Sequence, residues 1–177
     1  MREIRHVESG TSESFELEHQ ILVLDAGLRE PLDCSRCLSI TRRFVDDLLN
    51  ALGMDPLGKL GIYPAIDQRA PGWSFIQPIT TSHVSAHYFE KPGRTPHIRL
   101  DAYSCETVDW LNLVRICDRH FALGDWRATF IDRQIEPQHE RTVLDLAGTG
   151  SRVIAERVML PNTIISRGES QCMQRVR

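Results

Sequence analysis

The stretch GWSFIQPITTSHVSAHYFE, residues 72–90, carries the main strand signal of the chain. Its two halves, 72–80 and 82–90, are strand candidates separated by a single residue, so they form either two strands or one bent strand. Its centre, TTSHVSAHYF, contains two Thr, two Ser and two His in ten residues. A core strand is normally rich in Val, Ile and Phe, so this segment is either a polar edge or a site of chemistry.

Two amphipathic helices and further strands surround this segment. Residues 37–53 place apolar side chains at helical spacing, and Gly53 is positioned to end that helix. Residues 107–121 show the same spacing. The resulting order, β-α-β-β-β-β-α-β, predicts an α/β (α+β) two-layer sandwich: an antiparallel sheet with two helices packed on one face. The remaining predicted strands are residues 19–27, 59–66, 97–105 and 124–132.

The domain organisation follows from where these patterns begin and end. Residues 1–17 are polar and predict a loose N-terminal arm. Residues 18–134 form the predicted domain. Residues 135–177 form a C-terminal extension of unknown role, with turn-like patches and one short apolar run, RVIAERVML.

Composition and charge exclude several classes of function. The 177 residues carry a net charge of −3, so the chain lacks the excess of positive charge that nucleic-acid binding requires. No apolar run has the length of a signal peptide or a membrane span, so we expect a cytoplasmic protein without a membrane partner. The five cysteines are an odd number and are interpreted as reduced thiols.

Four motifs favour ordinary structural roles. His83 and His87 would share one face of a strand but lie roughly 13 Å apart, too far for one metal ion to bridge. The Cys34-Ser-Arg-Cys37 pair has no partner pair, which favours incidental thiols. The glycines of AGTGSR, residues 147–152, lack the spacing and Lys of a phosphate loop and predict a turn. No Gly-x-Ser-x-Gly turn is present, so a serine hydrolase is a poor interpretation and no metal is expected.

One arrangement points to chemistry. Ser82 has His83 directly after it, His87 five residues later, Ser74 eight residues earlier and Cys105 at +23. This arrangement resembles the small prokaryotic S-adenosylmethionine decarboxylases, which are self-processing pyruvoyl enzymes. That family has a Glu-Ser-His segment, an alternating strand with a second His, and a strand ending Asp-aliphatic-aromatic-Thr-Cys. The corresponding segments here are TSHVSAH (81–87) and DAYSC (101–105), and the resemblance covers residues 18–134.

The resemblance implies a role for each of these residues. Ser82 would attack the carbonyl of Thr81, and elimination of the resulting ester would split the chain and leave a pyruvoyl group at position 82. His87 would remove the α-proton during this cleavage, and Ser74 would support its intermediates. Cys105 would be the general acid that returns a proton to the substrate carbon after CO₂ leaves. A pyruvoyl carbonyl forms a Schiff base with an amine and acts as an electron sink, so no external cofactor is needed.

The resemblance also implies partners. His83, Val84 and Glu90 would contact the small-molecule substrate, with Glu90 near the place of a ribose-binding acid. Members of the family pair as homodimers with sites near the interface. Their product, decarboxylated S-adenosylmethionine, feeds spermidine biosynthesis.

Two departures from the family pattern keep alternatives open. Thr81 stands where the family has Glu, and the region of Gln68 lacks the aromatic residue that stacks on adenine. The alternatives are a pyruvoyl decarboxylase of another amino acid, such as arginine or ornithine, and a non-processing homologue that binds a ligand. Ser82 and His87 are five apart and would face opposite sides of a regular strand, so a bulge near residue 82 is expected. Pro78 makes an irregular strand plausible there.

Overall fold

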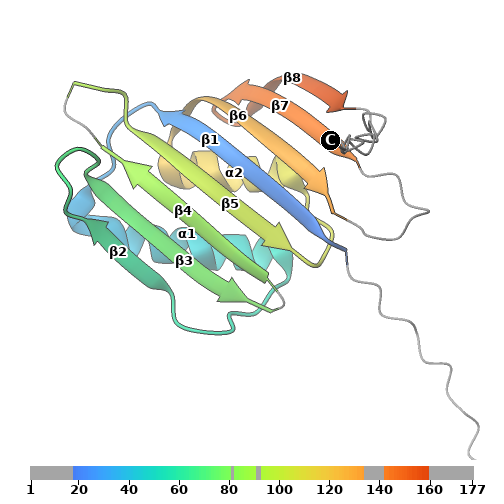
Figure 1. Cartoon of the computed structure of the whole chain (residues 1–177), viewed down its shortest axis with the longest axis horizontal. Coiled ribbons are helices and arrows are strands. Elements are labelled where there is room, and N and C mark those ends of the chain that lie inside the picture. The colour runs from blue at the N-terminus through green and yellow to red at the C-terminus, as the bar shows by residue number, and fades with distance from the viewer. Residues whose placement is uncertain (1–17, 81, 91–92, 134–141, 160–177) are drawn as a thin grey trace, which may run out of the picture.

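A single antiparallel sheet organises the computed structural model, which describes residues 18–80, 82–90, 93–133 and 142–159 (Figure 1). In these residues eight strands lie in the order β2-β3-β4-β5-β1-β6-β7-β8. The strands are β1 (Gln20–Leu28), β2 (Gly61–Ala65), β3 (Gly72–Ile79), β4 (Ser82–Phe89), β5 (His97–Ser104), β6 (Leu123–Asp132), β7 (Val143–Thr149) and β8 (Arg152–Met159). The helices are the short 3-10 turn η1 (Cys34–Arg36), α1 (Cys37–Leu52) and α2 (Trp110–Phe121). The predicted two-layer class and the order of its first eight elements are confirmed, and residues 72–90 form two strands.

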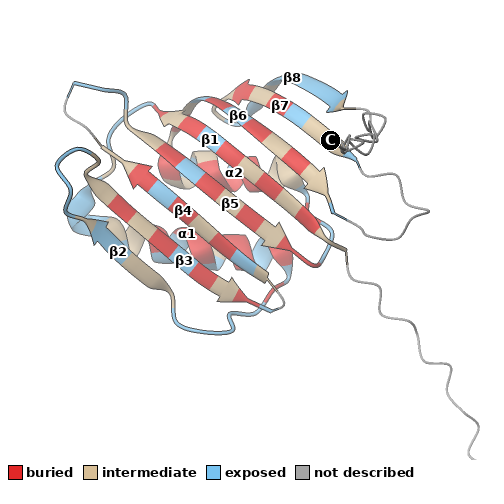
Figure 2. Ribbon diagram, viewed as in Figure 1, coloured by how far each residue is buried: buried red, intermediate tan, exposed pale blue. Residues whose placement is uncertain are grey.

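Both helices lie behind the sheet in Figure 1, on the side that we call the covered face. Side chains alternate along each central strand between this face and the opposite, open face, as the banding of Figure 2 shows. Apolar residues of the covered face meet the helices in one core, in which Leu24, Phe44 and Leu48 are fully buried. The open face carries the polar positions of the same strands.

The helix boundaries follow from capping residues. Gly53 ends α1 as predicted, with φ of 63° and its backbone N–H bonded to the carbonyl of Leu49. The second helix begins at Trp110, three residues later than the predicted start at 107, because the Asp109 side chain caps it by accepting from the backbone N–H of Asn112 at 3.0 Å.

The β3–β4 hairpin is regular, so the bulge expected near residue 82 is absent. Its register runs without a shift from the pair Gly72–Phe89 to the pair Ile79–Ser82. Pro78 fits this ladder because β2 pairs with β3 only as far as Ile76. The Pro78 carbonyl accepts from the backbone N–H of Leu57 on that outer side, and in an antiparallel strand the missing N–H points the same way.

The sheet continues past residue 134, where the resemblance ends. β7 pairs with β6, and β8 pairs with β7. The predicted turn in residues 147–152 is confirmed between these strands, where Gly150 has φ of 54°. β8 is exposed over most of its length, and neither helix covers it (Figures 1 and 2). Among the described residues, no helix has the length and apolar character needed to cross a bilayer.

Candidate active site

The end of the sheet at Ser82 gathers several predicted residues. Ser82 is the first residue of β4 and is half-buried, and its hydroxyl donates a hydrogen bond to the backbone carbonyl of Tyr103 on β5. His83 pairs with Tyr103 across the two strands, with ring centroids 6.0 Å apart on the open face. Thr81, the predicted residue before the cleavage point, lies outside the described residues. The Ser82 hydroxyl is therefore oriented by the backbone of β5.

Cys105 lies directly after β5 and is buried, with 4% of its surface exposed. Its Sγ is 3.7 Å from Nδ1 of His19, and the same nitrogen is 2.7 Å from the phenol oxygen of Tyr103. Burial, followed by the neighbouring Cys105 thiol, raises the pKa of Tyr103, so this phenol keeps its proton at neutral pH. A continuous path of contacts thus links Ser82, Tyr103, His19 and Cys105.

Buried hydrogen bonds hold this path in place. Gln20 is the first residue of β1, and its Oε1 accepts from the backbone N–H of Val108 at 2.7 Å. The Ser104 hydroxyl accepts from the N–H of Glu106 at 3.0 Å. These bonds fix the segment that carries Cys105 against the start of β1. On the outer side, the guanidinium of Arg133 lies 5.1 Å from the centroid of the Tyr103 ring, in cation–π range.

Ser74 and His87 form a second pair on the open face. They are directly opposite in the β3–β4 ladder, and the Ser74 hydroxyl is 2.7 Å from Nδ1 of His87. The His87 ring is exposed. Two residues that the sequence singled out for one reaction, thirteen positions apart, are therefore in hydrogen-bond contact. An imidazole held by a hydroxyl in this way can accept or donate a proton at its free nitrogen.

The structure does not bring this pair to Ser82 within one chain. Because β4 is regular, Ser82 and His87 face opposite sides of the sheet. Five strand residues separate them by roughly 16 Å. The predicted residues thus fall into two groups on one hairpin.

Two predicted substrate contacts lie elsewhere. The Val84 side chain is fully buried in the core on the covered face, so only the backbone of Val84 is left to meet a substrate, and the expected contact stays a prediction. Glu90 follows the far end of β4, where its carboxylate accepts from the phenol of Tyr88 and the thiol of Cys34, both at 3.1 Å. Burial and the nearby Glu90 raise the pKa of Cys34 to about 11, which makes it a poor nucleophile at neutral pH.

Sequence reasoning missed His19, Tyr103 and Arg133 as members of the site. Tyr103 is the aromatic residue of DAYSC, and its place two residues before Cys105 was a usable signal. His19 and Arg133 flank strands β1 and β6 at the same end of the sheet, where Gln20 pairs with Asp132. That neighbourhood depends on strand order and register, which the sequence pattern did not supply.

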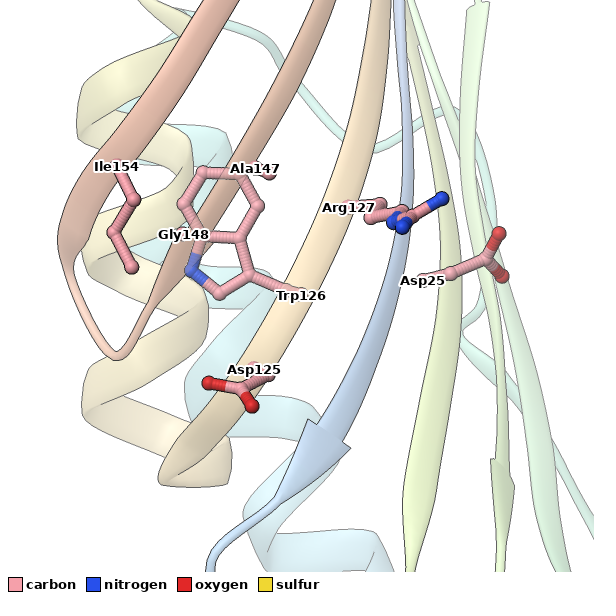
Figure 3. Close-up of a pocket in the computed structure, with 7 residues that line it drawn as sticks. All are labelled: Asp25, Asp125, Trp126, Arg127, Ala147, Gly148 and Ile154. Carbon is pink, nitrogen blue, oxygen red and sulfur yellow. The ribbon is translucent and has the colours of Figure 1, made fainter.

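One hollow of the surface contains none of the predicted reacting residues. The hollow in Figure 3 lies over β6, β7 and β8, at the opposite end of the sheet from Ser82. There the Trp126 indole occupies the space left by Gly148 and donates to the carbonyl of Gly150 at 2.8 Å, so it supports the β7–β8 hairpin. Within the described part of the chain, no three His, Cys, Asp or Glu side chains are grouped as metal ligands.

Comparison with known proteins adds no identification. No model of a protein family matches this chain, and no curated protein matches it.

Proposed function

We propose that this chain is the precursor of a pyruvoyl-dependent decarboxylase, made by self-cleavage between Thr81 and Ser82, with S-adenosylmethionine as its substrate. The observation that carries the proposal is the path of contacts from Ser82 through Tyr103 and His19 to Cys105. It connects the residue that would become the pyruvoyl group to the residue that would act as general acid. The Ser74–His87 hydrogen bond is the second support.

The position of Ser82 suits a residue that is cut from its neighbour. It starts β4 immediately after the hairpin turn, and the pair Ile79–Ser82 closes the β3–β4 ladder. A break before Ser82 would open the turn and leave the ladder intact. Both products would therefore stay bound in the sheet, and the new group at position 82 would lie beside Tyr103 and His83.

Three residues of the path, Ser82, Tyr103 and Cys105, then have a defined task. The Tyr103 carbonyl orients the Ser82 hydroxyl before cleavage. Cys105 supplies the proton that replaces CO₂ on the substrate carbon, and its burial excludes water from that transfer. The pyruvoyl group itself supplies the electron sink, which is why the chain would need no added cofactor.

A homodimer accounts for the separation of the two groups. Ser74 and His87 are roughly 16 Å along the hairpin from Ser82 of the same chain. Neither of the two described helices covers the open face (Figure 1), and a second copy is proposed to pack its sheet against this face. In a two-fold dimer one contact is repeated at two places, and the Ser74–His87 pair of each copy would approach the hairpin turn of the other copy, at the bond before Ser82.

The decisive experiment is an intact mass spectrum of the purified protein. We expect two chains, residues 1–81 and a second chain beginning at position 82 without a free amine. Ser82→Ala should leave one uncut chain, whereas Ser85→Ala, a matched change on the same strand, should still be cut. A single chain that persists on long incubation of the unsubstituted protein would reject the enzyme in favour of the ligand-binding homologue.

Mixed dimers test the arrangement of the site. Ser82→Ala and His87→Ala chains, each inactive alone, should regain roughly a quarter of the cleavage when co-expressed, because half of the dimers contain one complete site. Absence of any cleavage in the mixture would reject the exchange of His87 between the two copies.

Substrate choice needs its own measurement. The Glu90 carboxylate already accepts hydrogen bonds from Tyr88 and Cys34. In addition, residues 65–71 include no aromatic side chain that could stack on adenine. Release of CO₂ from S-adenosylmethionine, arginine and ornithine should therefore be compared on the cleaved protein. Turnover of S-adenosylmethionine alone supports the proposal, and turnover of one of the other two favours the alternative amino acid.

A further inference from the structure

His19 is the one residue of the contact path that has no role in the proposed chemistry so far. Its Nδ1 lies within reach of two proton-bearing groups, the Tyr103 phenol at 2.7 Å and the Cys105 thiol at 3.7 Å. The His19 and Tyr103 rings are stacked, with centroids 6.2 Å apart and planes inclined by 22°. The imidazole is therefore held in a fixed orientation, with one nitrogen aimed at the sulfur.

The backbone around His19 reinforces this geometry. The His19 carbonyl accepts from the backbone N–H of Arg133, and the next residue, Gln20, anchors the segment after Cys105. His19 and Cys105 belong to elements 86 positions apart, so the fold itself sets their distance. A half-buried imidazole against a buried thiol is the arrangement that transfers protons between nitrogen and sulfur.

We infer that His19 is a positioning residue that exchanges a proton with Cys105 and so restores the thiol after each turnover. This inference rests on the proposed function for the step in which Cys105 acts as an acid. In that step the electron pair left on the substrate carbon by the departing CO₂ takes the proton from Sγ, which becomes a thiolate. The Nδ1–H of His19 returns a proton to the sulfur, and His19 regains one from water. The net change is one proton taken up for each CO₂ released.

Other charged and titratable groups surround the His19–Cys105 pair and contribute to its electrostatic environment. Arg133 lies over the Tyr103 ring from β6, and His83 faces the same ring from β4. Glu18 precedes His19 and contacts the Gln20 amide, and Glu106 follows Cys105 on the exposed side. These groups are unchanged in every comparison below, so a difference between variants reports on His19.

The test measures the reactivity of the Cys105 thiol in the full chain with Ser82→Ala, which needs no pyruvoyl group. The protein is pulsed with methyl methanethiosulfonate across a pH series, and the modified Cys105 peptide is quantified by mass spectrometry. His19→Asn should lower this rate roughly tenfold at pH 7, because the variant lacks the imidazole nitrogen that lies beside the sulfur and can take its proton as it reacts.

Two controls make the comparison specific. His97→Asn is the same change at the far end of β5 and should leave the Cys105 profile unchanged. Cys34 is an internal control in every sample, since its rate should not respond to His19. Coincident Cys105 profiles in the parent protein and the His19→Asn variant would overturn the inference, as would an equal effect of His97→Asn.

A reciprocal measurement covers the case in which His19→Asn does not fold. In a Cys105→Ser protein the rate at which the His19 ring N–H exchanges with water, measured by NMR, should differ from that of the parent, because its Nδ1 contacts the sulfur. An unchanged exchange rate overturns the inference. Chain cleavage without this coupling would reject the role of His19 alone, whereas coupling without cleavage would reject the proposed decarboxylase and leave a thiol–imidazole pair.

Discussion

The two faces of the sheet carry different kinds of residues. On the covered face, Phe44 and its neighbours from α1 and α2 fill a closed core, and the buried polar group Thr41 is hydrogen-bonded to Trp73. On the open face, Ser74, His83 and His87 are half-buried or exposed; Ser74 and His87 are hydrogen-bonded, and His83 makes a ring contact with Tyr103. The closed core and the Ser74–His87 pair therefore lie on opposite faces of one sheet, so matched changes at these two places should have unlike effects.

The largest contrast is expected for two phenylalanines. Phe44 is fully buried against Phe75 and Phe121, with ring centroids 5.9 and 4.6 Å away. Phe44→Ala should lower the free energy of unfolding by about 3–5 kcal/mol, because it leaves a cavity. Phe89 on the open face is half-buried and stacks on His97 at 4.9 Å, and Phe89→Ala should cost about 1 kcal/mol. Urea denaturation of both variants measures this, and similar losses would mean that the open face is also a closed core.

The next contrast concerns two hydroxyls that each hold an aromatic ring nitrogen. The Thr41 hydroxyl is fully buried and accepts from the Trp73 indole at 3.0 Å. Thr41→Val should cost about 1–3 kcal/mol of unfolding free energy, because the buried N–H loses its partner. Ser74→Ala removes the 2.7 Å contact to His87 on the open face, where water can replace it. Its effect on stability should stay within about 0.5 kcal/mol.

The same two variants should reverse their order in chain cleavage. Ser74→Ala should slow the appearance of the two chains in the mass spectrum, because the His87 imidazole loses the group that orients it. Thr41→Val should be cut at the parental rate under conditions where it is folded. If Thr41→Val slowed cleavage as much as Ser74→Ala, the specific role of the Ser74–His87 pair in cleavage would be refuted.

The sequence predicted most of the fold because each of the predicted helices and strands has its own pattern of apolar residues. Residues 37–53 combined helical spacing with a terminal glycine, and the strands of 72–90 alternated in burial as their patterns required. β7 and β8 were not predicted. β8 is exposed along most of its length, so its sequence has no need for the alternation that marks a half-buried strand. A strand without a buried face leaves little trace in the pattern of apolar residues.

The candidate site was predictable as a list of residues but not as an arrangement. The spacing of Ser74, Ser82, His87 and Cys105 singled out residues that the structure places in two groups of contacts. The expected bulge that would have joined Ser82 to His87 is absent. The residues of β3 and β4 pair one to one along the whole hairpin, so neither strand contains an extra residue. His19 entered the site only through the pairing of β1 between β5 and β6, a long-range choice that spacing along the chain does not encode.

The smallest contrast concerns one carboxylate of each layer. Asp47 on α1 accepts from Nε2 of His120 on α2 at 2.8 Å, and this bond holds the pKa of Asp47 below its ordinary value. The folded state thus favours the carboxylate: the stabilisation is present above the ordinary pKa of Asp and is lost as the pH falls through the lowered value. Asp25 on the open face meets Arg99 at 3.4 Å, with both side chains more than half exposed, where an ion pair contributes little. Asp47→Asn should therefore lower the Tm slightly at pH 7 and not at about pH 2, whereas Asp25→Asn should leave the Tm unchanged at both. A Tm deficit of Asp47→Asn that persists in acid would show that the contact between the helices depends on the shape of the Asp47 side chain and not on its charge.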